Sequence, residues 1–321
     1  MRRAWIALVA VLAAGTLSAH AQNWPNRPVR VIIPFGAGSA TDVIPRIVFD
    51  KLSHELGQQL VVENRGGAGS TLGAAMVARA EPDGYTLLTT SSAHTIVPAL
   101  YPNLSYDTAR DFTAVGVIGS APNVLVISPA RGIKTLKDLV TAAKAKPGSF
   151  SFASLGVGSA VYMSAERFRI SAGYEAVHVP FKGGAEGLTE VMAGRVDYYF
   201  CPIATALPFI RDGKLLALAV SSPTRSPLLP DVPTTLEAGF KDSDYTVWFG
   251  MFAPAKTPQA IVDRLNAELI KAVQAPDVKE KLNALGVETM IMSPAAFGAE
   301  VKSETATYAE FAKAAGMKVS N

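Results

Sequence analysis

The apolar positions of the chain follow two alternating patterns, and the alternation predicts an α/β protein. Short apolar runs rich in β-branched residues are typical of strands that are buried on both faces. Each run is followed by a longer segment in which apolar residues recur every three or four positions. The first unit is Val29–Pro34, a Gly-rich turn, and a periodic segment from Thr41 to Leu56. This rhythm predicts mostly parallel sheets that are covered by helices.

The same rhythm continues along the chain and predicts two lobes. Further strands are expected at Leu60–Glu63, Tyr85–Thr90, Ser151–Ser154, Ala176–Pro180, Tyr198–Phe200, Leu216–Ser221 and Val247–Ala253. Further helices are expected up to Ala80 and at Thr135–Ala145, Ser159–Ser171, Ala185–Ala193, Ala204–Arg211, Pro258–Ala275, Val278–Leu285 and Pro294–Ala315. The apolar runs Phe112–Ile118 and Val124–Ser128 flank Ala121-Pro122, where we expect the chain to cross to the second lobe. We therefore assign residues 22–122 and 246–321 to lobe 1 and residues 123–245 to lobe 2.

Residues 1–21 have the pattern of a Sec-type signal peptide. Met1-Arg2-Arg3 is basic, Ala4–Leu17 carries no charge, and Ala19-His20-Ala21 places small residues where a signal peptidase reads them. The apolar run is shorter than the roughly 20 residues that span a bilayer. We therefore predict export to the periplasm with cleavage after Ala21.

Composition excludes several classes of protein. The 321 residues are 49% hydrophobic and 18% charged, the opposite balance to that of a disordered chain. The formal charge of +3 is small, and two of its positive charges, Arg2 and Arg3, belong to the predicted signal peptide. Such a weak and scattered excess does not fit a nucleic-acid binder. Cys201 is the single cysteine, so no intrachain disulfide can form.

Three loops share the pattern G-x-G-S-[A/T], and each lies between a predicted strand and a predicted helix. They are Gly36–Ala40, Gly67–Thr71 and Gly156–Ala160. Glycine allows close approach of the backbone to a ligand, and serine is a preferred N-cap. Unpaired N–H groups at a helix start attract anions, and ligands of open α/β sheets bind beyond the carboxyl ends of strands. Each loop is a potential anion cradle, with a tight turn plus N-cap as the alternative.

Motifs for cofactors are missing from the sequence. A dinucleotide fingerprint needs Gly or Ala at the sixth position of the loop, where Thr41, Leu72 and Val161 stand, and no phosphate-binding G-x-x-x-x-G-K-[S/T] motif occurs. The histidines show no metal-ligand spacing. We therefore expect neither a cofactor nor a metal.

The sequence gives little support for a Ser/His/Asp catalytic set. Ser91 and Ser92 stand near His94, and Asp42 follows the first Gly-rich loop, but no G-x-S-x-G elbow is present. Asp42 is better explained as an acidic residue that supports the first turn of its helix. Lys182 follows another strand, where it faces either an anion or solvent. A periplasmic Ser/His hydrolase stays an alternative.

The chain resembles the extracytoplasmic substrate-binding proteins of tripartite tricarboxylate transporters, the Bug or TctC-like family, over nearly its whole predicted mature length. The resemblance rests on WPNRPVRVIIPFGAGSATD (Trp24–Asp42), VVENRGGAGSTLGAAMVARAEPDGYTLL (Val61–Leu88), SSAHTIVPALYPNLSYD (Ser91–Asp107), HVPFKGGAEGLTEVMAGRVDYYF (His178–Phe200), LALAVSSPTRSPLLPDVPTTLEAGF (Leu216–Phe240) and WFGMFAPAKTPQAIVDRLNAE (Trp248–Glu268).

This resemblance implies a type II-like periplasmic binding protein with a ligand cleft between two α/β lobes. It implies a receptor without catalytic activity that captures a small carboxylate and delivers it to a membrane permease. We expect a monomer, although the sequence does not determine the oligomeric state. By analogy, lobe 1 would contact the ligand through Phe35, Gly36, Gly38, Ser39, Ala40, Asp42, Ser70, Ser91 and His94. Lobe 2 would contribute Gly158, Ser159, Lys182, Gly183 and Cys201.

The sequence departs from the family pattern at two places. Gly36-Ala37-Gly38-Ser39 replaces the common P-[F/Y]-x-P-G-G, and Cys201 stands where the family commonly has Asp. Loss of that carboxylate removes a partner for an amino group, so we expect a dicarboxylate, tricarboxylate or aromatic carboxylate and not an amino acid. A sensory role beside a two-component system also stays open, because it would differ only in the surface used for interaction.

Overall fold

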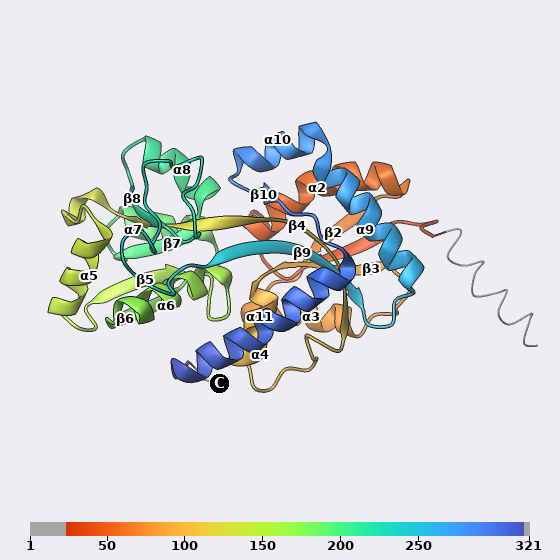
Figure 1. Cartoon of the computed structure of the whole chain (residues 1–321), viewed down its shortest axis with the longest axis horizontal. Helices are drawn as coiled ribbons and strands as arrows, with labels where there is room; N and C mark the ends of the chain where they lie inside the picture. Colours follow the sequence, from red (N-terminus) through yellow and green to blue (C-terminus); the bar gives the residue numbers. More distant parts are fainter. Residues whose placement is uncertain (1–23, 318–321) are drawn as a thin grey trace, which may run out of the picture.

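Ten strands form one continuous mixed sheet in the computed structural model, which describes residues 24–317. The strand order is β2-β1-β3-β9-β4-β7-β5-β6, and β8 and β10 also pair with β4. The two ends of this sheet carry separate groups of helices (Figure 1), which we call lobe 1 and lobe 2. The predicted signal peptide and its cleavage site after Ala21 lie outside the described residues.

Lobe 1 is built from the two ends of the described chain. Its first part contains β1 (Val29–Ile33), α2 (Ala40–Leu56), β2 (Leu60–Asn64), the 3-10 turn η1 (Ala68–Ser70), α3 (Thr71–Ala78), β3 (Thr86–Ser91), α4 (Ala93–Leu100) and most of β4 (Phe112–Ile127). Its second part contains β9 (Thr246–Pro254), α9 (Gln259–Gln274), α10 (Pro276–Ala284), β10 (Glu288–Thr289) and α11 (Pro294–Ala314).

Lobe 2 is built from the central part of the chain. It contains η2 (Pro129–Arg131), α5 (Leu136–Ala145), β5 (Phe150–Ser154), α6 (Ala160–Ala172), β6 (Ala176–Pro180), α7 (Gly184–Met192), β7 (Tyr198–Pro202), α8 (Ile203–Arg211) and β8 (Leu216–Val220).

The strands within each lobe pair in parallel, whereas the strands that join the lobes pair antiparallel. β1 is parallel to β2 and β3, and β5 is parallel to β6 and β7. The long strand β4 is antiparallel to β9 up to Pro122 and to β7 from Asn123 onward. The sheet is therefore mixed rather than mostly parallel, because the chain crosses between lobes on β4 and returns on β9 (Figure 1).

Two local features differ from the expectations. Phe112–Ile127 is one strand that includes Pro122, where two separate runs are expected from the sequence. Helix α4 is not predicted, because Ala93–Val97 is buried throughout and its polar residues, His94 and Thr95, therefore do not mark an exposed face of an amphipathic helix.

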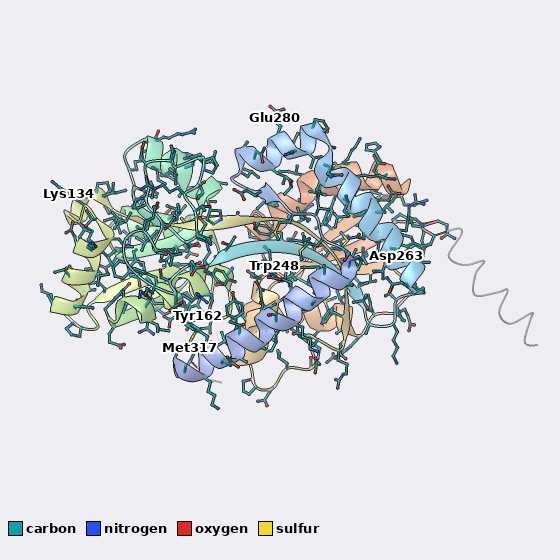
Figure 2. All side chains as sticks on the ribbon, viewed as in Figure 1. Lys134, Tyr162, Trp248, Asp263, Glu280 and Met317 are labelled. Atoms are coloured by element: carbon teal, nitrogen blue, oxygen red, sulfur yellow. The ribbon has the colours of Figure 1, made fainter. Side chains whose placement is uncertain are left out.

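The core of each lobe lies between its helices and the sheet. In lobe 2 the side chains of β7 alternate, with Tyr198 and Phe200 packed on one face and Tyr199 and Cys201 on the other. Ala160 and Met163 of α6 pack into the core cluster of lobe 1, so the start of α6 joins the lobes. Figure 2 shows Trp248 in the middle of the molecule and Tyr162 and Met317 near the distal end of α11, which runs beneath both lobes.

Across residues 24–317, no helix has the length and apolar character needed to cross a membrane.

Candidate ligand-binding site

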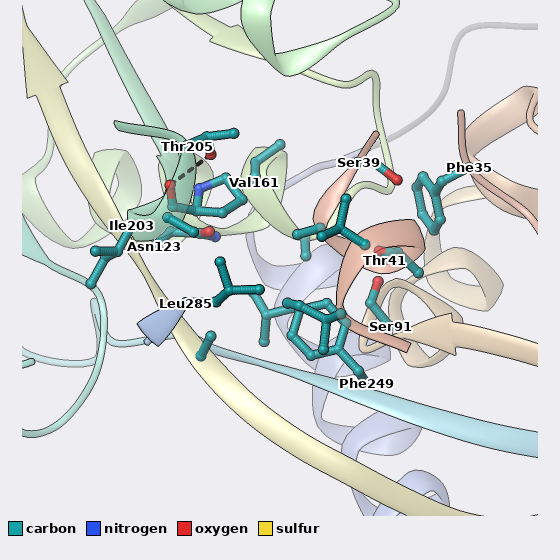
Figure 3. A pocket seen from close by; sticks show the side chains of 18 of the residues that line it. Phe35, Ser39, Thr41, Ser91, Asn123, Val161, Ile203, Thr205, Phe249 and Leu285 are labelled. Carbon is teal, nitrogen blue, oxygen red and sulfur yellow. Dashed lines mark hydrogen bonds between the residues drawn. The ribbon is translucent and has the colours of Figure 1, made fainter. Parts of the chain in front are cut away.

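A cavity of about 230 Å³, which we call the inner cavity, lies where the two lobes meet (Figure 3). It is lined by the β1–α2 loop and the end of β3 in lobe 1, and by the β5–α6 loop and the start of α8 in lobe 2. The strands β4 and β9 cross beside it. Its lining residues are Phe35, Gly38, Ser39, Ala40, Thr41, Val43, Ile44, Ser91, Ala121, Pro122, Asn123, Leu155, Ser159, Ala160, Val161, Pro202, Ile203, Ala204, Thr205, Val247, Phe249 and Leu285.

The lining of the inner cavity is mostly apolar. Among the described residues that form it, none has a charged side chain. The polar side chains are those of Ser39, Thr41, Ser91, Asn123, Ser159 and Thr205. An anion in this cavity would therefore depend on hydroxyl, amide and backbone N–H groups.

Two helix starts with the same backbone geometry reach the inner cavity from opposite lobes. Ser39 caps α2 with φ −70° and ψ 159°, and Ser159 caps α6 with φ −73° and ψ 152°. The preceding glycines, Gly38 and Gly158, have φ of 80° and 86°, in the left-handed region that favours glycine. The first N–H groups of each helix lack acceptors within the helix and carry the positive end of its dipole. The geometry thus directs two partial positive charges toward one cavity.

The hydroxyl groups of these two serines are used differently. The Ser159 hydroxyl donates to the Gly156 carbonyl at 2.7 Å and accepts from the Tyr162 N–H at 3.3 Å. The Ser39 Oγ atom is buried and has no hydrogen-bond partner. A buried hydroxyl without a partner is costly unless a ligand or water completes it. Ser39 is therefore the side chain in the cavity that most clearly lacks a partner.

Asp42 holds the first loop rather than the ligand position. Its buried carboxylate accepts from the Gly38 N–H at 2.9 Å, the Asn64 amide at 2.9 Å and the Arg46 guanidinium at 2.8 Å. Burial alone would raise the pKa of Asp42, but these hydrogen bonds and the Arg46 charge outweigh it and lower the pKa. Asp42 is thus charged, and it fixes the turn at Gly38 that precedes α2.

A second cavity of about 710 Å³, which we call the outer cavity, adjoins the inner one. The two share Phe35, Gly38, Ser39 and Leu155. Gly36, Ser70, Lys182 and Gly183 line only the outer cavity, and the Lys182 side chain is exposed. The middle Gly-rich loop therefore faces the outer cavity and not the inner one.

His94 is a packing residue. Its imidazole is buried, contacts Phe112 and Phe252 at centroid distances of 4.9 and 4.7 Å, and leaves Nε2 without a partner. Burial lowers the pKa of His94 to about 3, so the ring is neutral at neutral pH. Ser92 bonds to the Tyr245 hydroxyl at 2.6 Å, while Ser91 lines the inner cavity. The serines and His94 are near in sequence without forming a hydrogen-bonded catalytic pair.

The structure places Cys201 in the core and not in the cavity lining. Its side chain is fully buried, its Sγ lies 3.8 Å from the Val124 carbonyl, and burial raises the pKa of the thiol. The reason is strand alternation, which turns Cys201 toward the apolar cluster of Tyr199 and Val124. The next residues, Pro202–Thr205, line the inner cavity instead.

Sequence reasoning also missed Asn123 and the start of α8. Asn123 is buried at the point where β4 changes partner, and its amide donates to Ser164 at 2.9 Å. Thr205 donates to the Pro202 carbonyl at 2.7 Å (Figure 3). The position of α8 in the sequence could have indicated its role, because α8 follows the carboxyl end of β7 just as α6 follows the carboxyl end of β5, and ligands bind beyond such ends.

Two α/β lobes joined by crossing strands, with helix starts from both lobes on one cavity between them, define a solute-binding protein of the periplasmic type. Comparison with known proteins identifies the family. Residues 44–315 match the family described as tripartite tricarboxylate transporter family receptor, and the chain belongs to this family.

Relatives and solved structures agree with this assignment. The chain is 38% identical over 298 residues to the UPF0065 protein in the tcbD-tcbE intergenic region of Pseudomonas sp. strain P51, covering 92% of this chain and 89% of that protein. The structure of the periplasmic binding protein BugD has a TM-score of 0.86 at 33% identity, covering 92% and 100% of the two chains. MatC from Rhodopseudomonas palustris with bound malate has a TM-score of 0.84 at 33% identity, covering 89% and 99%.

Proposed function

We propose that this protein is an exported, non-catalytic receptor that binds a small carboxylate in the inner cavity and delivers it to the permease of a tripartite tricarboxylate transporter. The observation that carries the proposal is the convergence of two helix starts, one from each lobe and each with a serine at its N-cap position, on a cavity whose described lining has no charged side chain. Helix starts bind anions through backbone N–H groups and the helix dipole. A receptor that relies on these weaker interactions also releases its ligand more readily than one built on buried ion pairs.

The lining supports a carboxylate with an apolar body. Phe35, Val161, Phe249 and Leu285 form apolar walls, and neither Asp nor Glu is among the described lining residues. An ammonium group would be buried there without a counter-charge, which is strongly unfavourable. Aromatic carboxylates and short dicarboxylates fit this chemistry better than α-amino acids.

Closure of the two lobes would couple binding to recognition by the permease. A ligand that contacts Ser39 of lobe 1 and Ser159 of lobe 2 makes its full set of contacts only when the lobes are together. It therefore stabilises the closed form by its differential affinity for that form. The strands β4 and β9, which join the lobes, are the natural place for the bending.

Isothermal titration calorimetry on the mature protein tests the ligand class. The panel is malate, adipate, citrate, benzoate and aspartate at neutral pH. We expect measurable binding of at least one carboxylate without an amino group and none of aspartate. Binding of aspartate alone would contradict the proposal. Deletion of the gene, followed by measurement of both carboxylate uptake and the transcriptional response, separates delivery to a permease from a sensory role.

A further inference from the structure

The lobes are held together by a contact that lies outside the inner cavity. The hydroxyl of Tyr101, which follows α4 in lobe 1, donates to the main-chain carbonyl of Val157 in lobe 2 at 3.1 Å. Val157 belongs to the third Gly-rich loop, two residues before the Ser159 cap that lines the inner cavity. One hydrogen bond thus joins lobe 1 to the loop that carries half of the proposed site.

The middle Gly-rich loop lies against the same contact. A Cβ atom on Gly69 would lie 2.5 Å from the Tyr101 hydroxyl oxygen and 2.7 Å from the Val157 carbonyl oxygen. A Cβ atom on Gly158 would lie 3.3 Å from Cε2 of Tyr101 and 3.9 Å from the Gly69 carbonyl oxygen. Gly69 therefore leaves no room for a methyl group beside Tyr101 and Val157, whereas a methyl group on Gly158 would make one tight contact, with the Tyr101 ring.

Apolar packing surrounds this hydrogen bond. Tyr101 and Val157 are half-buried, and both pack against the lobe 1 core cluster that also contains Ala160 and Met163. Burial raises the pKa of Tyr101, so its hydroxyl keeps its proton and stays a donor at neutral pH. The contact is therefore partly shielded from water, which strengthens a neutral hydrogen bond.

We propose that Tyr101, seated between Gly69 and Gly158, is a latch that stabilises the closed form before any ligand binds and positions the Ser159 loop. The middle Gly-rich loop then serves lobe closure and not anion binding. The latch reduces the differential binding that a ligand must supply to close the lobes, so it raises the apparent affinity for every ligand of the site. This inference rests on the proposed function, but its main test needs no ligand.

The test measures the distance between the lobes in the ligand-free mature protein. Spin labels are attached to Met76→Cys on α3 and Val177→Cys on β6, which are exposed, while the native Cys201 is fully buried and unreactive. Pulsed electron–electron double resonance then gives the distribution of distances between the two labels, and from it the ratio of closed to open molecules. We expect Tyr101→Phe to lower this ratio about fivefold, the effect of one neutral hydrogen bond. Tyr85→Phe is the matched control, because its hydroxyl bonds to Asn26 within lobe 1.

A second pair of variants tests the close approach. Gly69→Ala should shift the protein to the open form more strongly than Tyr101→Phe, because the new methyl group must displace Tyr101 or Val157. Gly57→Ala is its control, since Gly57 has a similar φ of 70°, against 62° for Gly69, and open space around a Cβ atom. Circular dichroism confirms that each variant is folded.

Three results would overturn the latch: a wholly open ligand-free wild type, a distance distribution of Tyr101→Phe equal to that of the wild type, or an equal shift in Tyr85→Phe. If the carboxylate panel shows no binding, the proposed function fails, yet the ligand-free distances still decide the latch. Where a carboxylate binds, its affinity for Tyr101→Phe should fall by no more than the same fivefold or so.

Discussion

The two loops that line the inner cavity and the middle Gly-rich loop have nearly the same sequence but different conformations. Gly36–Ala40 and Gly156–Ala160 each place a serine in an extended conformation directly before a helix of more than ten residues. In the middle loop Ser70 has φ 85°, and Ala68 and Gly69 also have positive φ, so the chain makes a 3-10 turn before α3. The pattern G-x-G-S therefore does not determine the conformation by itself.

Tertiary contacts explain the difference. Helix α3 lies so close to β1 that a Cβ atom on Gly73 would approach Pro34 and the Arg65 carbonyl to 2.8 Å. The start of α3 thus packs against the segments that follow β1 and β2, and the loop before it contacts Tyr101 and Val157 of lobe 2. The pattern G-x-G-S thus begins a helix at the inner cavity in two of the loops, and in the middle loop it forms a contact between the lobes.

The largest expected difference in carboxylate affinity is that between a variant at Gly38, which lines both cavities, and a variant at Lys182, which lines only the outer cavity. Gly38→Val puts a β-branched residue at φ 80° and should weaken carboxylate binding by about 2–3 kcal/mol, because the loop must leave its left-handed conformation. Lys182→Ala removes an exposed charge and should change binding by less than about 1 kcal/mol. Calorimetry with the tightest-binding carboxylate of the panel measures both.

Gly148→Val is the control for backbone strain, because Gly148 has φ 73° and open space but precedes β5, at the opposite end of that strand from the Gly156–Ala160 loop. It should lower thermal stability without changing affinity. A larger loss of affinity in Lys182→Ala than in Gly38→Val would show that a side-chain charge, and not the backbone, anchors the ligand.

The pH dependence of the free energy of unfolding tests whether His94 is a buried, neutral packing residue. His94 has a pKa of about 3 in the folded protein and about 6.5 when unfolded, so the unfolded state binds more protons between these values. Its contribution to stability is therefore complete at pH 7.5 and about 2 kcal/mol smaller at pH 5. Chemical denaturation at the two pH values should show that His94→Gln loses this part of the pH dependence.

The comparison uses the difference between wild type and variant, because burial raises the pKa of Glu304 and gives a pH dependence of opposite sign. His54→Gln on the exposed face of α2 should retain the wild-type slope. An unchanged slope in His94→Gln would mean that the pKa of His94 is the same in the folded and unfolded states, which contradicts a neutral imidazole held by burial.

The smallest expected effects distinguish the roles of Ser39 and Ser159, the two serines at the N-cap positions of α2 and α6. Ser39→Ala should reduce carboxylate affinity by about 1.5 kcal/mol through loss of a hydrogen bond to a charged group, with little change in stability, because its hydroxyl makes no internal bond. Ser159→Ala should lower the free energy of unfolding by about 1 kcal/mol, since its hydroxyl caps α6. Calorimetry and urea denaturation measure the two quantities on both variants, and the reverse pattern would contradict the assignment.

Local sequence predicted most of the fold because each element has a clear signal. The strands of both lobes and the helices Thr41–Leu56 and Pro258–Ala275 are close to their observed bounds, since their apolar periodicity reflects one buried face. Helix α4 has no such signal, because it is buried on nearly all sides. The two-residue strand β10 is too short to produce one.

The candidate site was predicted in part. Of the predicted residues, the inner cavity is lined by Phe35, Gly38, Ser39, Ala40, Ser91 and Ser159. Gly36, Ser70, Lys182 and Gly183 line only the outer cavity, and Asp42, His94, Gly158 and Cys201 line neither. Asp42 is occupied by three hydrogen bonds, and Cys201 faces inward because of its place in the strand alternation. Asn123 and Thr205 line the cavity through the pairing of β4 with β7, which is a contact between residues far apart in the chain.

The sequence by itself determined the alternation of strands and helices, the glycines that permit left-handed turns, and the serines that begin helices. These properties depend on residues within a few positions of one another. Only the tertiary structure decided which helix starts share a cavity, which serine hydroxyl is left without a partner, and which Gly-rich loop meets the other lobe. The physical reason is that hydrogen-bond satisfaction and close packing are settled between segments that the chain brings together only when β4 and β9 join the lobes.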